Sequence, residues 1–335
     1  MEGNRIYPAC MQQNRQSPEA LVKSIVISAS FPDTVRSADA LVQALRLAAG
    51  EGFYDTVEFF HEGDRTAFAR IRKELERFPQ PSVYLAGAYL KSRQLNLGSL
   101  DERHRRHAIA ETKKMIDQAY FFGSSKMLIT SGQTPAAEAE RKASFGLLAD
   151  SLKELCEYAE RRAEGRILQI TLEFFNDRGE PYFLIGPTPV AKQLAEAVAP
   201  DCGNFEITFD LSHVIQLGEN PAESLALLAP HVRHVHLANC YLKDANHPLY
   251  GDRHPPFELE DGEIGREDAF SFLLELERQG FFGRREAWTM GIEVIPPPSA
   301  DALDIYRKTT SLYREWMERL QQMRRERDRK KAERR

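Results

Sequence analysis

The chain contains four short stretches that decide its fold: LEFF at residues 172–175, FDLSH at 209–213, HVHL at 234–237 and GIEV at 291–294. Each stretch contains β-branched or aromatic residues, which are typical of a buried strand. Each also carries a carboxylate or an imidazole where the apolar run ends. The repeated position predicts that these polar side chains lie at one edge of a parallel sheet.

Strand-like runs alternate with helical patterns along the whole chain. Residues 24–30 (SIVISAS) precede residues 37–49, in which apolar residues recur at helical spacing. Seven further strands are predicted at residues 56–60, 82–86, 126–130, 167–172, 205–209, 232–237 and 290–295. Eight β/α units in order indicate an α/β protein, namely a single (β/α)8 TIM barrel, whose chemistry lies at the C-terminal strand ends. An open dinucleotide-binding sheet is disfavoured because the turn after the first strand, residues 31–33 (FPD), has no glycine.

We expect the chain to have three parts. A loose N-terminal arm covers residues 1–22, the barrel covers residues 23–322, and a basic helical tail covers residues 323–335. The tail carries eight Lys or Arg residues against three Asp or Glu residues. Such a run is typical of a solvated helix end.

Composition excludes several classes of protein. Apolar residues make up 42% and charged residues 28%, as in soluble globular chains. The net charge of −5 argues against a dedicated nucleic-acid binder. The four cysteines have no C-x-x-C spacing, so neither a zinc knuckle nor a disulfide framework is expected. No run of about 18 apolar residues exists, and residues 1–10 do not resemble a signal peptide. We therefore predict a cytoplasmic protein that makes no contact with a membrane.

Four of the strand-end residues are candidate metal ligands: Glu173, Asp210, His236 and Glu293. Taken singly, each has an ordinary explanation, since Asp210 could cap the next helix and His236 could be a core histidine. However, all four fall at the same point of the fifth to eighth strands, whose ends converge on one rim of a barrel. Carboxylates with one imidazole suit a hard divalent cation. The pattern therefore predicts a metal site.

These motifs resemble the xylose isomerase-like TIM-barrel superfamily of sugar isomerases and epimerases, from about residue 23 to about residue 316. Its members carry a Glu after strand five, Asp-x-x-His after strand six, a His after strand seven and a Glu after strand eight. The matching residues here are Glu173, Asp210 with His213, His236 and Glu293. The resemblance implies one divalent metal, with Mn²⁺ as the first choice and Mg²⁺, Co²⁺ or Zn²⁺ as alternatives.

The same resemblance implies a reaction on a keto-sugar. Glu173 and Glu293 would move protons at the carbon next to a carbonyl that the metal polarises. This assignment is chemically sound, because a Lewis acid stabilises the charge of the resulting enediolate. His213 would act as a catalytic residue that holds a substrate hydroxyl or the carbonyl oxygen. Alternatively, His213 would only form a hydrogen bond to a metal ligand and orient it.

The long segment after strand seven, with Asp252 and His254, resembles the corresponding loop of C-glycoside deglycosidase α-subunits. This implies an alternative reaction, cleavage of 3-oxo-C-glycosides by the same enolisation followed by elimination. The substrate would then be a sugar conjugate, and the partner would be a small β-subunit; a homo-oligomer is the other assembly considered. The loop after strand five departs from that family because residues 176–180 (NDRGE) lack the basic run expected there.

A third alternative belongs to another class of enzyme, the zinc-dependent apurinic endonuclease branch of the superfamily. His61 resembles its ligand after strand two, and Asp252 with His254 resembles its last motif. The position after strand three, residues 86–89 (AGAY), offers no imidazole. We therefore expect His61, His213, Asp252 and His254 to bind substrate, and we do not expect nucleic acid to be the partner.

Overall fold

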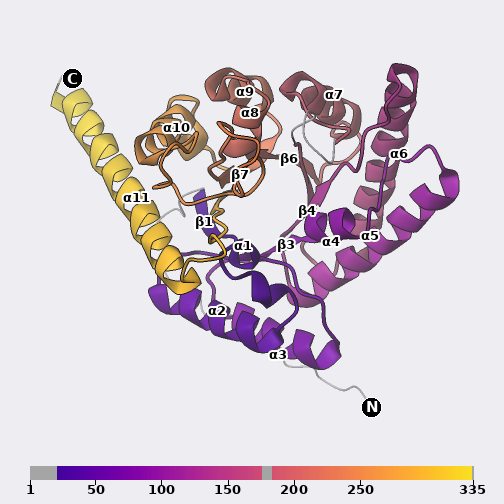
Figure 1. Ribbon diagram of the computed structural model, residues 1–335, viewed down its shortest axis with the longest axis horizontal. Helices are drawn as coiled ribbons and strands as arrows, with labels where there is room; N and C mark the ends of the chain where they lie inside the picture. The colour runs from indigo at the N-terminus through magenta and orange to yellow at the C-terminus, as the bar shows by residue number, and fades with distance from the viewer. Residues whose placement is uncertain (1–20, 176–182, 334–335) are drawn as a thin grey trace, which may run out of the picture.

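The eight strands of the protein form a parallel barrel in the computed structural model, which describes residues 21–175 and 183–333. The strand order is β1-β8-β7-β6-β5-β4-β3-β2, and every pairing is parallel. The end strands β1 and β2 are joined by one bridge, Val26 to Glu58. Figure 1 shows the helices arranged around the strands. The predicted single (β/α)8 barrel is confirmed.

The strands that build the barrel are short, and most are buried along their whole length. They are β1 Leu21–Ile25, β2 Glu58–Phe59, β3 Val83–Leu85, β4 Lys126–Thr130, β5 Gln169–Glu173, β6 Phe205–Asp210, β7 Val232–Leu237 and β8 Trp288–Ile292.

Eight helices of eight residues or more cover the outside of the strands within the described chain. They are α2 Ala38–Glu51, α3 Arg65–Leu75, α5 Glu102–Phe122, α6 Glu138–Arg162, α7 Thr188–Val198, α9 Pro221–Leu228, α10 Arg266–Arg278 and α11 Ala302–Glu333. The shorter helical turns are α1 Ile27–Ser30, η1 Pro32–Val35, α4 Ala86–Ser92, α8 Leu211–Gln216 and η2 Phe281–Gly283.

The first strand differs from its prediction at residues 24–30. It ends at Ile25, and the chain turns into α1 because both the backbone nitrogen and the hydroxyl of Ser30 donate to the Val26 carbonyl, at 3.0 and 3.1 Å. Leu21 and Val22, which we counted with the arm, begin β1 and pair with β8. The rest of the predicted arm, residues 1–20, lies outside the described residues.

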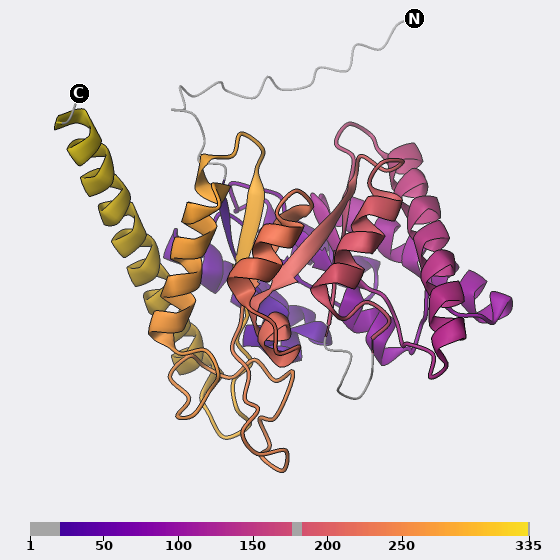
Figure 2. The ribbon, with the colours of Figure 1, turned by 90° about the horizontal axis from the view of Figure 1, so that it is seen from above.

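A long loop between β7 and α10 extends beyond the C-terminal ends of the strands (Figure 2). Buried Asn239 organises it: its carbonyl oxygen accepts from the backbone nitrogens of Cys240 and Ile264, both at 2.8 Å, and its amide donates to the Pro256 carbonyl at 3.1 Å. Because one side chain at the start of the loop binds Pro256 and Ile264, which are 17 and 25 residues away, the loop has a defined course.

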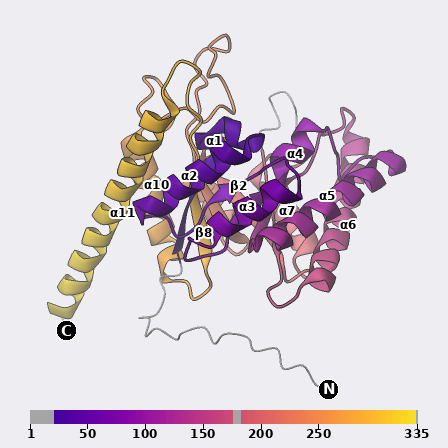
Figure 3. The ribbon, with the colours of Figure 1, turned by 90° about the horizontal axis from the view of Figure 1, so that it is seen from below.

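Helix α11 supports the same loop and then continues as the basic tail. Trp316, which is 1% exposed, packs edge-on against Phe257 of the loop with ring centroids 5.1 Å apart. The buried residues of α11 stop at Leu320, and the helix runs on away from the barrel to Glu333 (Figure 3). In the described ranges, no helix is long and apolar enough to cross a membrane.

Replacing Trp316 with Ala should destabilise the protein by about 3 to 5 kcal/mol, because it opens a cavity under the loop between β7 and α10. Urea unfolding monitored by circular dichroism measures this loss. Met323→Ala, on the same helix at a 44% exposed position, is the control and should stay within about 0.5 kcal/mol of the wild type. Equal stability of the two variants would contradict the support that we assign to Trp316.

Candidate metal centre

The four predicted metal ligands meet at the C-terminal rim of the barrel. Atoms of Glu173, Asp210, His236 and Glu293 lie within 4.8 Å of one another. The Nδ1 atom of His236 is 3.1 Å from Glu173 Oε1, 3.0 Å from Glu293 Oε2 and 3.7 Å from Asp210 Oδ2. The strand register explains the convergence, because Asp210 pairs with His236 on the neighbouring strand and Glu293 follows β8 directly.

The two carboxylate oxygens of Asp210 have different roles. Oδ1 caps α8, accepting from the Ser212 nitrogen and hydroxyl, both at 2.7 Å, and from the His213 nitrogen at 3.2 Å. Oδ2 is buried and has no hydrogen-bond partner within the described part of the chain. Asp210 therefore caps helix α8, which is the ordinary role of an aspartate at this position. Its second oxygen still faces the centre.

This set of donors fits a divalent cation. Three carboxylates and one imidazole converge, and a buried carboxylate oxygen without a partner is costly unless a cation or a proton meets it. Oxygen-rich sites with one imidazole suit Mn²⁺, Mg²⁺, Co²⁺ or Zn²⁺. Glu173, Asp210, His236 and Glu293 are the residues that could hold such an ion.

His236 is held from behind by Glu58, a residue that the sequence analysis missed. The Nε2 atom of His236 donates to Glu58 Oε2 at 2.9 Å, and Glu58 Oε1 accepts from His234 Nε2 at 3.1 Å. Burial alone would lower the pKa of His236, but the charges of Glu58 and Glu293 raise it well above its usual range. Burial alone would raise the pKa of Glu58, but the two imidazoles hold it well below.

A second polar cluster lies beside the four ligands. Asp252 Oδ1 accepts from His213 Nε2 at 3.2 Å and forms an ion pair with His254 Nε2 at 3.0 Å, and Asp252 Oδ2 accepts from Lys91 at 3.2 Å. The other ring nitrogen of His213 donates to the Phe174 carbonyl at 3.1 Å. Because both nitrogens of His213 face oxygen acceptors, the ring is held as an imidazolium.

Charges around this cluster shift the pKa values of its members. Burial would lower the pKa of His213, but Asp210 and Asp252 raise it to about 9. Burial would likewise lower the pKa of His254, but Glu293 and Asp252 raise it to about 10. Asp252 has its pKa held well below the usual range by the two imidazoles, against the effect of burial.

Lys91 was also missed by the sequence analysis. It lies on α4, directly after β3, and its ammonium is 5.5 Å from the ring centre of Phe175 and 5.7 Å from that of Phe183. Its sequence context resembles that of an ordinary surface lysine. Glu58 did leave a signal, because a single charge within the apolar run of residues 56–60 (TVEFF) requires a buried partner.

His61 occupies a different position from the other predicted site residues. Its ring is 1% exposed, bonds through Nδ1 to the Thr34 carbonyl at 2.8 Å, and packs against Phe68. In residues 21–175 and 183–333, no hydrogen bond or ion pair joins His61 to the metal ligands or to Asp252. Its role in substrate binding stays a prediction.

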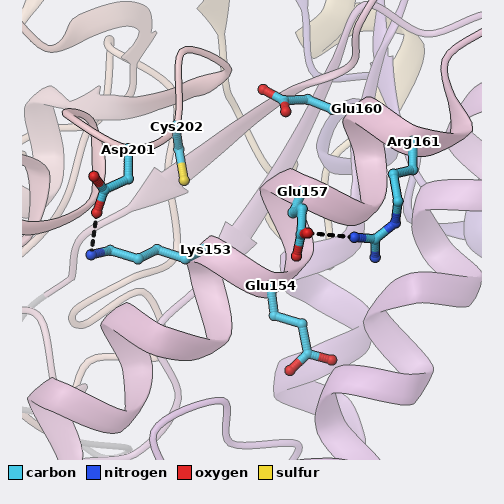
Figure 4. A pocket seen from close by; sticks show the side chains of 7 residues that line it. All are labelled: Lys153, Glu154, Glu157, Glu160, Arg161, Asp201 and Cys202. Atoms are coloured by element: carbon cyan, nitrogen blue, oxygen red, sulfur yellow. Dashed lines mark hydrogen bonds and ion pairs between the residues drawn. The ribbon is translucent and has the colours of Figure 1, made fainter.

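Figure 4 shows the side chains that line a cavity of about 610 Å³, none of which belongs to the candidate metal centre. It is formed by residues of α6 together with Asp201 and Cys202, which precede β6 and therefore lie at the N-terminal end of that strand. Its acidic side chains are largely paired, as Asp201 is with Lys153 and Glu157 with Arg161. It has no part in the site at the opposite end of the barrel.

The contacts of His254 predict a pH-dependent stability in the metal-free protein. A histidine whose pKa is raised from about 6.5 to about 10 stabilises the fold fully below the lower value. That contribution is lost as the pH rises through the higher one. The gap in unfolding free energy between wild type and His254→Gln should therefore be largest at pH 6 and should shrink towards pH 10.5. Urea unfolding in EDTA measures it, and a gap that is constant or grows with pH would contradict the assignment.

Known proteins that are similar to this chain share the barrel fold described above. The family model described as xylose isomerase-like TIM barrel matches residues 45–316. A comparison with curated proteins found no match.

Solved structures share the fold at low identity. A D-tagatose 3-epimerase-like protein superposes with a TM-score of 0.66 at 19% identity, covering 90% of this chain and 99% of that one. The IolI protein with a bound zinc atom gives 0.64 at 17% identity, covering 88% and 97%. A family 2 AP endonuclease from Brucella melitensis gives 0.58 at 18% identity, covering 85% and 95%. At such identities these likenesses show the fold alone, whereas the family match spans most of the sequence: the chain belongs to the xylose isomerase-like TIM barrel family.

Proposed function

We propose that the protein is a divalent-metal-dependent isomerase or epimerase that removes a proton next to the carbonyl of a keto-sugar. The observation that carries this proposal is the convergence of Glu173, Glu293 and Nδ1 of His236 on Asp210, whose Oδ2 atom has no hydrogen-bond partner among the described residues. The similarity in fold to a D-tagatose 3-epimerase-like protein agrees with a sugar substrate.

Glu173 and Glu293 are the proposed proton carriers. Glu173 ends β5 and Glu293 follows β8, and their oxygens lie 3.1 and 3.0 Å from the same imidazole nitrogen. A substrate bound between them would present one face to each carboxylate, so that one can take a proton and the other can return one. The bound metal, for which we propose Mn²⁺, would supply Lewis-acid polarisation of the carbonyl.

Asp252, His213 and His254 are the proposed substrate-binding residues. The Asp252 side chain is 28% exposed, so it can accept a hydrogen bond from a substrate hydroxyl. A substrate oxygen could also take the place of Asp252 at the Nε2 atom of His213. Because the imidazolium of His213 donates from both nitrogens, it would favour an oxygen that gains negative charge during enolisation.

Cleavage of 3-oxo-C-glycosides is the alternative within the same chemistry. Enolisation would proceed as above, and loss of the aglycone carbon would replace reprotonation. The feature that favours it is the loop between β7 and α10, which carries Asp252 and His254. This alternative proposes a small β-subunit as partner, whereas the isomerase is compatible with a homo-oligomer.

A zinc-dependent apurinic endonuclease is the candidate from another class, and the cluster of His213, Asp252 and His254 favours it. The opposing observation is that α4 follows β3 immediately, and its residues 86–92 contain no imidazole. Counting bound zinc by elemental analysis and assaying an abasic-site duplex separates the candidates. Detection of three bound zinc ions together with cleavage of the duplex would show that the protein is a nuclease and would contradict the sugar enzyme.

Incubation with a ketose panel and Mn²⁺ in deuterium oxide should place deuterium at the carbon that loses its proton. Glu173→Gln and Glu293→Gln should each slow this exchange by roughly 10²- to 10⁴-fold, because each removes a proton carrier. Nuclear magnetic resonance of the recovered sugar measures the exchange.

Glu62→Gln provides the matched control. Glu62 lies after β2 and its side chain is 35% exposed, so the same chemical change there should leave the exchange rate intact. A panel of ketoses and 3-oxo-C-glycosides that shows neither turnover nor exchange with the wild type would contradict the proposed reaction.

A further inference from the structure

Glu58 is a carboxylate in the interior of the barrel with no access to solvent. Its side chain is 0% exposed, and both of its oxygens accept hydrogen bonds, Oε1 from His234 at 3.1 Å and Oε2 from His236 at 2.9 Å. A buried carboxylate is costly unless it is paired and hydrogen-bonded. A single interaction partner would leave one oxygen unsatisfied, and the two imidazoles together satisfy both.

These contacts determine which nitrogen of His236 can bind a cation. An ionised carboxylate only accepts hydrogen bonds, so Glu58 accepts the single ring proton on Nε2 whenever Nδ1 gives its lone pair to a cation. The lone pair then lies on Nδ1, which is the nitrogen that points at Glu173, Glu293 and Asp210. The partner of the distal nitrogen thus sets both the tautomer and the orientation of the ring.

Glu58 is itself fixed by a chain of hydrogen bonds across the barrel. The Nδ1 atom of His234 lies 3.0 Å from the Thr208 hydroxyl, which is 2.6 Å from the Thr171 hydroxyl. This chain connects β7, β6 and β5 to β2. Because each member is buried, the carboxylate has one well-defined position.

Gly291 provides independent support for the fixed position of the Glu58 carboxylate. A Cβ atom at Gly291 would lie 2.2 Å from Glu58 Oε1 and 3.2 Å from Cδ2 of His236. Any other residue at this point of β8 would therefore displace the carboxylate or the imidazole. The glycine in residues 291–294 (GIEV) leaves room for the pair.

The group Glu58, His234 and His236 could also be considered as a metal site of its own. Within the described part of the chain, neither oxygen of Glu58 lacks a partner, in contrast to Oδ2 of Asp210. The hydrogen-bonded arrangement therefore accounts for these three residues without an ion.

We propose that Glu58 is a positioning residue for the metal centre: it holds the proton of His236 on Nε2 and aims Nδ1 at the cation. The inference rests on the metal site of the proposed function and is independent of the substrate. It predicts that the affinity for the metal depends on a carboxylate that never touches the ion.

Four variants test this role. Glu58→Met removes the hydrogen-bond acceptor and keeps a side chain of similar length. Gly291→Ala keeps the carboxylate of Glu58 but displaces it, because the added methyl group occupies its position. Glu58→Gln is the conservative variant, since its amide oxygen can still accept from Nε2 of His236. Thr112→Val is the control, because it removes a buried hydrogen bond to the Ala108 carbonyl within α5 and leaves Glu58 and its chain of hydrogen bonds in place.

The dissociation constant for Mn²⁺, measured by electron paramagnetic resonance of the free ion, should rise roughly 10- to 100-fold in Glu58→Met and Gly291→Ala. It should rise less in Glu58→Gln and stay unchanged in Thr112→Val. Urea unfolding confirms that each variant is folded. Metal-free protein provides the second measurement: the imidazole N–H proton resonance of His236 should be protected from exchange in the wild type and in Thr112→Val, and lost in Glu58→Met.

Two results would overturn the inference. If the folded Met and Ala variants bound Mn²⁺ as tightly as the wild type, Glu58 would have no influence on the metal. If Thr112→Val weakened binding equally, the effect would be a general loss of packing. A wild type that binds no Mn²⁺ would instead overturn the proposed function, and this inference with it.

Discussion

Repulsion among three carboxylates at one end of the barrel is the constraint on which the rest of the site depends. Glu173, Asp210 and Glu293 are brought together by the parallel register of β5 to β8, which the packing of the barrel imposes. Negative charges this close, in a region that excludes water, raise the free energy of the protein unless positive charge lies between them. His236 supplies part of it, and a divalent cation would supply the rest.

The residues behind and beside the proposed ligands follow from the same constraint. Glu58 anchors His236 so that one nitrogen always faces the carboxylates. On the other side, His213 and His254 place positive charge next to Asp210, and Asp252 holds both imidazoles. The site is therefore an alternation of acidic and basic groups, in which moving any one charge leaves a neighbour unpaired and buried.

The barrel and the convergence of the four proposed ligands could be predicted because their signals are local. Each strand is an apolar run, and Asp210 and Glu293 stand where such runs end, so the position of each can be found from its own neighbours in sequence. The contacts of Glu58 and Lys91 could not be predicted, because each joins residues far apart in the sequence. Glu58 lies 178 residues from His236, and Lys91 lies 161 residues from Asp252. Such pairings depend on which strands and loops face one another. The early end of β1 had another cause, the bonds from Ser30 to the carbonyl of Val26.

The most direct test of the metal centre is an anomalous difference map from crystals grown with Mn²⁺. One peak should lie about 2.0 to 2.6 Å from an oxygen of each of Glu173, Asp210 and Glu293 and from Nδ1 of His236. Ordered density for these side chains with no peak between them, or a peak only among His213, Asp252 and His254, would contradict it.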